Sequence, residues 1–513
     1  MKEHVRNVSF AFLSGILGSL AFPPFELTFL GWVCLIPFLL FIKGDRPKEN
    51  FLYAYLTGVV FFGLLTYWLV NVTIPGMIIL VLILSVFYGL FGLIAGYAFK
   101  YSMNLLILPF VWVVLEFIRG NIFTGFPWGL LGYSQYTNIN LIQIADITGV
   151  YGVSFLIVVF NVAMLGVFKR SKRKIAHMMI ALLFILVSTS YGIYRQQNMK
   201  DWGSAKISVV QGNVPQNLKW DPAFAKEIVK EYTGLTKEAA LDKPDIIIWP
   251  ETAYPYLFTK GGGEAEEVNA LSKKLGIPIL AGVVSLEGDD YYNSAVLFNG
   301  KSEISAKYDK LHLVPFGEYV PFKKSLSFLR KYIDKPIGDF EKGSSYTLFP
   351  VTSARSSTGS DGALMRTTNF FKFGALICFE DAFPYISREF VKKGAGFLVN
   401  MTNDAWFGET AAPRQHMQAS VFRAVENRVP VVRAANTGIS CFIDYTGNII
   451  SRVRKGQQDI FIGGFATDEI KVSRVRTYYT VYGDVFVYFC AFMVILLMIT
   501  EGLYIKNEKK KQG

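Results

Sequence analysis

The run Phe373-Gly374-Ala375-Leu376-Ile377-Cys378-Phe379-Glu380-Asp381 decides how the central part of this chain is interpreted. Its first five residues are small or apolar, and they predict a buried strand. Cys378 follows that strand directly, and two acidic residues come next. A strand that delivers a thiol into an acidic turn is a typical way to present a cysteine nucleophile. The run therefore predicts a strand end that carries chemistry.

Two upstream segments also place reactive side chains next to predicted strands. The apolar stretch 246–250 ends in Glu251, which is suited to proton transfer. The stretch 308–318 carries Lys310, suited to stabilise an oxyanion, and Glu318, suited to orient that lysine. Taken singly, the three have ordinary alternatives: a packing cysteine, a solvated glutamate and a surface lysine. Together, a base, a cation and a thiol predict acyl-transfer chemistry.

The composition predicts a membrane protein. The 513 residues are 52% hydrophobic, and this fraction is high for a soluble chain. The net charge is +12, but short basic runs at 169–174 and 506–511 flank apolar stretches. Such placement is typical of membrane topology signals, so nucleic acid is not expected as a partner.

The cysteines and histidines do not predict a metal site. The four cysteines form no CxxC pair, and the four histidines are scattered without an HExxH motif. Cys34 and Cys490 lie inside apolar stretches and are expected to pack there. We therefore expect neither a metal ion nor an organic cofactor.

Apolar stretches divide the chain into three parts. A membrane span needs about 20 apolar residues, with roughly 17 as the lower limit. Seven spans are expected at 7–23, 27–43, 51–71, 77–99, 104–118, 150–168 and 175–194, and an eighth at 482–504. The predicted domains are a transmembrane domain over 1–200, a catalytic domain over 201–478, and a final span with a basic tail over 479–513.

The basic residues predict the orientation. With the N-terminus in the cytoplasm, the inner segments carry Lys2, Lys43, Lys100, the run 169–174 and the C-terminal lysines. The expected outer loops carry almost no lysine or arginine, as the positive-inside rule requires. Both termini would then be cytoplasmic, and residues 200–478 would lie outside the cytoplasm.

The central part alternates short β-rich runs with charged, helix-like stretches. Strands are expected at 207–210, 246–249, 278–284, 294–298, 374–377, 396–399, 431–434 and 441–444. Helices are expected at 223–240, 264–275, 383–393 and 416–427. The Ser/Gly-rich stretch 353–362 predicts a surface loop. The β-then-α order implies an α/β sheet domain covered by helices.

The three reactive segments resemble those of the nitrilase, or carbon–nitrogen hydrolase, superfamily over about 206–472. Trp249-Pro250-Glu251 resembles its glutamate motif, Tyr308 to Glu318 its lysine motif, and Ile377 to Asp381 its cysteine motif. The resemblance implies an αββα sandwich. With the expected spans included, the whole chain resembles the bacterial apolipoprotein N-acyltransferase family.

This second resemblance implies a function and a location. Cys378 would take an acyl group from a phospholipid, with phosphatidylethanolamine expected, and pass it to a diacylated apolipoprotein. Glu251 and Lys310 would complete the triad, supported by Glu318 and Glu380. Residues that would bind substrate are Trp128, Trp220, Asn293, Asn400, Asn403 and Trp406. The location implied is the bacterial inner membrane, with a periplasmic catalytic domain.

Two alternatives use the same sequence features. A membrane-tethered amidase would use the same triad with water as second nucleophile, but one anchor would suffice for it. A transporter with a large outer domain would be expected to show ionisable residues within its spans and duplicated halves. The expected spans contain few charges, Glu116 among them, and no repeat is evident.

Overall fold

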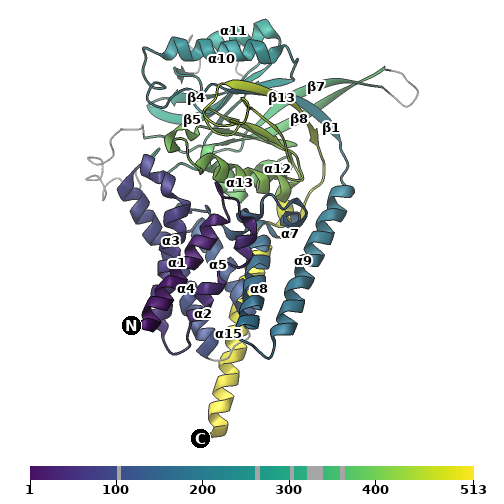
Figure 1. Cartoon of the computed structure of the whole chain (residues 1–513). Helices are drawn as coiled ribbons and strands as arrows, with labels where there is room; N and C mark the ends of the chain where they lie inside the picture. The colour runs from purple at the N-terminus through teal and green to yellow at the C-terminus, as the bar shows by residue number, and fades with distance from the viewer. Residues whose placement is uncertain (101–104, 260–265, 301–305, 320–338, 359–363, 513) are drawn as a thin grey trace. The chain divides into compact units, whose positions relative to one another are not determined.

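The computed structural model describes residues 1–100, 105–259, 266–300, 306–319, 339–358 and 364–512 (Figure 1). These residues form two compact units. A helical unit comprises Met1–Asn198 with Tyr482–Gly513, and an α/β unit comprises Met199–Val481.

The helical unit consists of helices joined by short connections. Its longer helices are α1 (Lys2–Leu20), α3 (Pro47–Leu65), α4 (Ile74–Lys100), α5 (Ile107–Asn121), α8 (Val150–Phe168), α9 (Lys174–Gln197) and α15 (Val485–Gln512). Shorter helices are α2 (Ile36–Phe41), α6 (Ile139–Ile142) and α7 (Ala145–Thr148). Among the described residues, α4, α8 and α9 are long and apolar enough to cross a bilayer.

One expected span is not a continuous helix. The range 27–43 divides into a 3-10 turn, Thr28–Trp32, and the six-residue helix α2. Pro37 lies in the first turn of α2, where a missing N–H costs nothing, so the sequence starts a new helix there. The range 27–43 is therefore divided into two helical pieces, and its crossing of a membrane stays a prediction. Helix α5 has 15 residues, fewer than a span usually needs.

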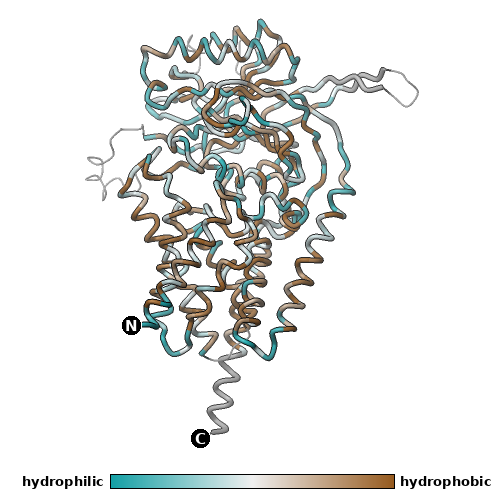
Figure 2. The backbone as a smooth tube through the Cα atoms, in the orientation of Figure 1, coloured by the Kyte–Doolittle hydropathy of each residue, from teal (hydrophilic) through white to brown (hydrophobic). Residues whose placement is uncertain are grey.

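Most residues along the helices of the helical unit are hydrophobic (Figure 2). Large exposed hydrophobic residues lie on α4, α9 and α15, including Ile79, Ile83, Leu186, Phe492 and Ile495. A helix that is apolar on its exposed face is typical of an apolar surrounding medium. This pattern agrees with the high hydrophobic content of the sequence.

The first sheet of the α/β unit has the strand order β13-β1-β2-β4-β5-β6, and β3 pairs with β4. The strands are β1 (Gly203–Gln211), β2 (Ile246–Ile248), β3 (Leu257–Thr259), β4 (Ile279–Glu287), β5 (Asp290–Phe298), β6 (Ala306–Asp309) and β13 (Gly464–Val472). Strands β1, β2 and β4 run parallel, with Ile207 paired to Ile246 and Ile247 to Ile279. The remaining main-path pairs are antiparallel.

The second sheet has the order β12-β11-β10-β9-β8-β7. Its strands are β7 (Leu348–Thr358), β8 (Leu364–Ile377), β9 (Phe397–Thr402), β10 (Val431–Ala435), β11 (Cys441–Ile443) and β12 (Ile449–Arg452). Strands β8, β9 and β10 are parallel, with Ile377 opposite Met401. Every residue of β9 and β10 is buried, as expected for strands covered on both faces.

The two sheets contact each other, and helices cover their outer faces (Figure 1). Helices α10 (Ala225–Ala240) and α11 (Glu266–Leu275) pack on the first sheet, and α12 (Pro384–Lys392) and α13 (Ala412–Asn427) pack on the second. Apolar residues such as Val210, Ile247 and Trp249 form the core under α10 and α11. The unit is therefore a four-layered α/β sandwich.

Most expected strands and helices lie where the sequence places them, but the loop expected at 353–362 is wrong in part. Residues 353–358 belong to β7 and pair with residues 364–369 of β8 in an antiparallel hairpin. The rest of that expected loop, 359–363, lies outside the described residues. Strands β3, β7, β12 and β13 were not predicted, and β6 overlaps the expected reactive stretch 308–318 only at residues 308 and 309.

Candidate active site

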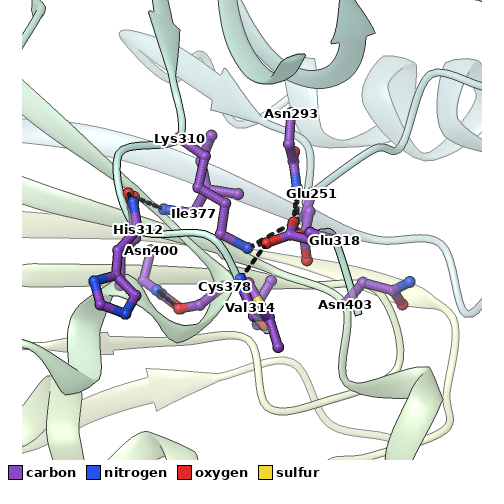
Figure 3. Close-up of polar contacts among 12 residues, drawn as sticks. Glu251, Asn293, Lys310, His312, Val314, Glu318, Ile377, Cys378, Asn400 and Asn403 are labelled. Carbon is purple, nitrogen blue, oxygen red and sulfur yellow. Dashed lines mark hydrogen bonds and ion pairs between the residues drawn. The ribbon is translucent and has the colours of Figure 1, made fainter. Parts of the chain in front are cut away.

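Cys378 lies where β8 ends and a short 3-10 turn begins. The four residues before Cys378 are buried, so their packing holds the end of the strand in place. The backbone of Cys378 has φ of +54°, a left-handed conformation that L-residues rarely adopt. Such strained backbone is common where a reactive side chain is turned out of the line of its strand. The structure thus presents this thiol at a sharp turn (Figure 3).

Glu251 follows β2 and is also held at an unusual turn. Its side chain is buried, and the next residue, Thr252, has φ of +45°. Strand β4 passes close behind this turn at Gly282, where a Cβ atom would lie 2.7 Å from the Glu251 Cα. Only glycine allows the two backbones to approach so closely. The neighbouring strand therefore sets the position of this carboxylate.

Lys310 follows β6, and its ammonium lies between two carboxylates (Figure 3). The Nζ atom is 2.9 Å from Glu318 Oε1 and 3.7 Å from Glu251 Oε1. Burial alone would lower the pKa of Lys310, but Glu318 and Glu251 outweigh it and raise that pKa above its ordinary value. The side chain is 1% exposed and stays a cation at physiological pH.

Asn293 of β5 joins the two carboxylates. Its Nδ2 atom donates to Glu251 Oε1 at 2.7 Å and to Glu318 Oε1 at 2.9 Å. Glu318 is held further by the backbone N–H of Val314, 2.8 Å from Oε2. Asn293 was expected to bind substrate, but these bonds give its amide a role in orienting the two acids.

Glu380 connects the lysine segment to the cysteine segment. Its carboxylate accepts backbone N–H groups from Leu311 at 2.6 Å, His312 at 3.0 Å and Ile377 at 2.7 Å, and the Tyr308 hydroxyl donates to both oxygens. Burial raises the pKa of Glu380 to about 7, against these hydrogen bonds and the charge of Lys310. The side chain thus ties β6 of one sheet to β8 of the other.

A second polar cluster holds the backbone behind the nucleophile. The carbonyl oxygen of Cys378 accepts from Asn400 Nδ2 at 2.9 Å, and His416 Nε2 lies 3.2 Å from it. His416 also contacts Asp381 at 2.8 Å and Asp404 at 3.0 Å. Burial would lower the pKa of His416, but these two carboxylates outweigh burial and raise it to about 9. The sequence alone did not indicate this role, because His416 is one of four histidines scattered along the chain.

The surroundings keep the resting thiol protonated. Burial and the negative charge of Glu251 raise the pKa of Cys378 well above its ordinary value, while Lys310 opposes them. Asp404 and Glu318 raise it further. A thiol in this setting needs a base at the moment of attack. The geometry provides a carboxylate, a fixed cation and a thiol that converge (Figure 3).

The other residues expected to bind substrate lie in different settings. Asn403 uses both ends of its amide inside the protein, donating to Gln216 and accepting from Asn436. Trp220 is 49% exposed, and Trp406 lies in a partly exposed 3-10 turn. Trp128 belongs to the helical unit, where its ring lies 5.3 Å from that of Trp68. Substrate contact by the tryptophans stays a prediction.

The described residues hold no group of three or more His, Cys, Asp or Glu side chains arranged for a metal ion.

Comparison with known proteins agrees with both units. Residues 14–163 match the model of the apolipoprotein N-acyltransferase N-terminal domain, and residues 206–477 match that of the carbon–nitrogen hydrolases. The yeast nitrilase-superfamily protein Nit3 is 17% identical, with a TM-score of 0.39 over 53% of this chain and 91% of that chain.

Full-length relatives are more similar. An apolipoprotein N-acyltransferase of Geobacter metallireducens is 37% identical over 94% of this chain and 93% of that protein. Those of Haemophilus influenzae and Pasteurella multocida are 32% and 30% identical, covering 95% and 97% of this chain and 93% and 96% of those proteins.

Proposed function

Because the chain belongs to the apolipoprotein N-acyltransferase family and N-acylates lipoproteins during their maturation, we propose that Cys378 carries the acyl group as a thioester. The observation that supports this most is the convergence of Cys378, Lys310 and Glu251 at three strand ends of two facing sheets. We assign Glu251 as general base and Lys310 as the cation that stabilises the oxyanion.

The first half-reaction forms the thioester. Glu251 takes the proton from the thiol of Cys378 while the sulfur attacks the ester carbonyl of a phospholipid. Lys310 faces the negative charge on the tetrahedral oxygen, and one such group is worth about 3–4 kcal/mol in known enzymes. When the C–O bond breaks, the leaving alkoxide takes the proton from Glu251 and departs as lysophospholipid.

The second half-reaction forms the amide. The α-amino group of a diacylglyceryl-cysteine attacks the thioester carbonyl, and Glu251 accepts a proton from that nitrogen. The C–S bond breaks, the thiolate regains a proton, and the N-acylated product leaves. Because one substrate departs before the other reacts, the steady-state kinetics are ping-pong.

The same proposal places the protein in the bacterial inner membrane. The exposed apolar residues of α4, α9 and α15 support contact with lipid. A phospholipid donor, here phosphatidylethanolamine, and a lipid-modified acceptor both reside at such a surface. An enzyme that serves two lipid substrates gains from being embedded beside them.

The basic segments of the helical unit support the proposed orientation. Lys43 forms an ion pair with Glu3 of α1, and the ammonium of Lys169 lies 3.8 Å from the ring centroid of Phe99, next to Lys100. These contacts bring expected inner segments together at the end of the unit that holds the N-terminus (Figure 1). We assign this end to the cytoplasm and the α/β unit to the periplasm.

Mass spectrometry of the full-length protein in detergent tests the assignment. Incubation with phosphatidylethanolamine is expected to add one fatty acyl group to the peptide that contains Cys378. Adding a diacylated peptide is expected to remove that group and acylate the peptide. The Cys378→Ala variant, with Cys441→Ala as the control, is expected to lose both events.

Acylation of another residue, or retained transfer in the Cys378→Ala variant, would contradict the assignment. Hydrolysis of the phospholipid without any transfer to the peptide would contradict the acceptor step.

A further inference from the structure

Lys219 is a second buried cation at the active site, and neither proposed half-reaction uses it. It is 3% exposed, and its Nζ atom donates to the backbone carbonyl of Glu251 at 2.9 Å. Among the described residues, this carbonyl is the one acceptor bonded to the ammonium. A buried ammonium can donate three hydrogen bonds; this one has a single neutral acceptor, and the Trp220 ring centroid lies 6.0 Å from it as a cation–π partner.

The loop that carries Lys219 is fixed to the second sheet. The backbone of Val214 exchanges two hydrogen bonds with the side chain of Asn436, at 2.9 and 2.8 Å. The side chain of Gln216 accepts a bond from Asn403 at 2.7 Å. The Lys219 backbone N–H then closes a turn onto the carbonyl of Pro215. The lysine is therefore held in place by contacts that cross between the sheets.

The charges around Lys219 influence the pKa of its ammonium. Burial lowers the pKa of Lys219 to about 8, and the negative forms of Glu251 and Cys378 act against that lowering. Lys310 differs, because Glu318 and Glu251 keep it cationic. The site thus contains one permanent cation and one whose charge depends on pH near neutrality.

We propose that the ammonium of Lys219 is a positioning group that stabilises the thiolate of Cys378 and holds the Glu251 backbone in its turn. The inference rests on the proposed function, in which Cys378 is the nucleophile. Lys219 does not exchange a proton in either half-reaction. It remains an ammonium while the proton of the thiol passes to Glu251.

Four other charged groups also influence the balance between thiol and thiolate at Cys378. Glu251, Asp404 and Glu318 disfavour the thiolate, and Lys310 favours it. Lys219 interacts electrostatically with the charge of Cys378, so removing this cation is expected to lower the thiolate population ~10-fold, which corresponds to one pKa unit. Because Lys219 itself loses its proton near pH 8, that effect is expected below this pH and is expected to fade above it.

Three substitutions separate the charge from the hydrogen bond. Lys219→Arg keeps the charge, Lys219→Gln keeps a donor for the Glu251 carbonyl without a charge, and Lys219→Met removes both. Lys230→Met on the exposed face of α10 is the matched control.

The primary measurement is the rate of Cys378 alkylation by iodoacetamide between pH 6.5 and 9.5. Peptide mass spectrometry follows the reaction in the full-length, detergent-solubilised protein.

At pH 7 we expect alkylation to be ~10-fold slower in the Gln and Met variants, and near the wild-type rate in the Arg and Lys230→Met variants. At pH 9.5 the Gln and Met variants are expected to converge with the wild type. Rates of the Gln variant that equal the wild-type rates across the whole range would overturn the proposal, even if acyl transfer were lost.

Alkylation needs no lipid, so this experiment is independent of the acyl donor. If the wild type fails to form an acyl-enzyme, the proposed function fails, whereas the pH dependence of alkylation still reports on Lys219. Thermal unfolding of each variant shows which of them fold, and Lys219→Gln supplies the decisive comparison if Lys219→Met does not.

Discussion

The side-chain amide of Asn293 donates a 2.7 Å hydrogen bond to the carboxylate of Glu251. The same nitrogen also donates to Glu318 at 2.9 Å, so one amide orients both acids that flank Lys310. This arrangement keeps two carboxylates and an ammonium in one buried cluster.

Replacing that amide should disturb the base without removing it. Asn293→Ala is expected to lower the rate of acyl-enzyme formation about 100-fold, because a small displacement of a reacting group has an effect of that size. Asn293→Asp should lower it further, since a third carboxylate would repel the other two. Asp290→Asn, at the exposed start of the same strand, is the control. Unchanged activity of Asn293→Ala would show that Glu251 is oriented without it.

Replacing Glu251 should have opposite effects on two properties of the thiol. Its negative charge raises the pKa of Cys378, so Glu251→Gln is expected to lower that pKa and to speed alkylation at pH 8. The same variant lacks the proposed general base and should lose about 10²–10⁴-fold in acyl transfer. Parallel measurements of alkylation and transfer check this divergence. A decrease in both would contradict the assigned electrostatic role.

The close approach of β4 to the Glu251 turn predicts a steric effect. In Gly282→Ala the new Cβ would lie 2.3 Å from the Pro250 carbonyl oxygen, so the turn must move. We expect a loss of about 1–3 kcal/mol in stability and a marked loss of acyl transfer. Gly234→Ala is the matched control, because a Cβ there meets no atom within 4 Å and should stabilise α10 slightly. Equal melting temperatures for the two variants would refute the prediction.

The buried His416 predicts a stability that depends on pH. Its carboxylate partners Asp381 and Asp404 raise its pKa in the folded state to about 9, from about 6.5 in an unfolded chain, although burial and Arg433 act in the opposite direction. The contribution of protonated His416 to the free energy of unfolding is therefore complete below about pH 6.5. Roughly 3 kcal/mol of that free energy is lost as the pH rises to about 9.

Thermal unfolding of the wild type from pH 6 to 9.5 checks this slope. We expect the slope of stability with pH to be smaller in His416→Gln. The slope should be retained in the control His4→Gln, because His4 lies exposed on α1. The same slope in the two variants would assign the pH dependence to other groups.

Local sequence predicted the strands that position Glu251 and Cys378, because each is a short apolar run that ends in a reactive residue. The runs before Glu251 and Cys378 are buried strands, as their composition indicates. The extension of β7 and β8 was missed because serine and glycine predict a loop, whereas each strand completes its hydrogen bonds with the other. Whether two strands pair depends on the partner strand, so the preferences of the local residues do not predict it.

The finer parts of the site depend on contacts between distant residues. Asn293 and Glu251 are 42 positions apart, and His416 is 35 positions from Asp381. Nothing next to Lys219 in the sequence indicates that its ammonium is buried beside the Glu251 carbonyl. The sheet topology creates these relationships, so a sequence motif can nominate the reacting groups but not the groups that tune them.

The proposed reacting groups come from opposite halves of the sandwich: Glu251 and Lys310 follow strands of the first sheet, and Cys378 follows a strand of the second. A folding intermediate in which strands β1 to β6 have formed without the second sheet would hold a base and a cation but no nucleophile beside them. Chemical competence therefore arises only when the second half docks.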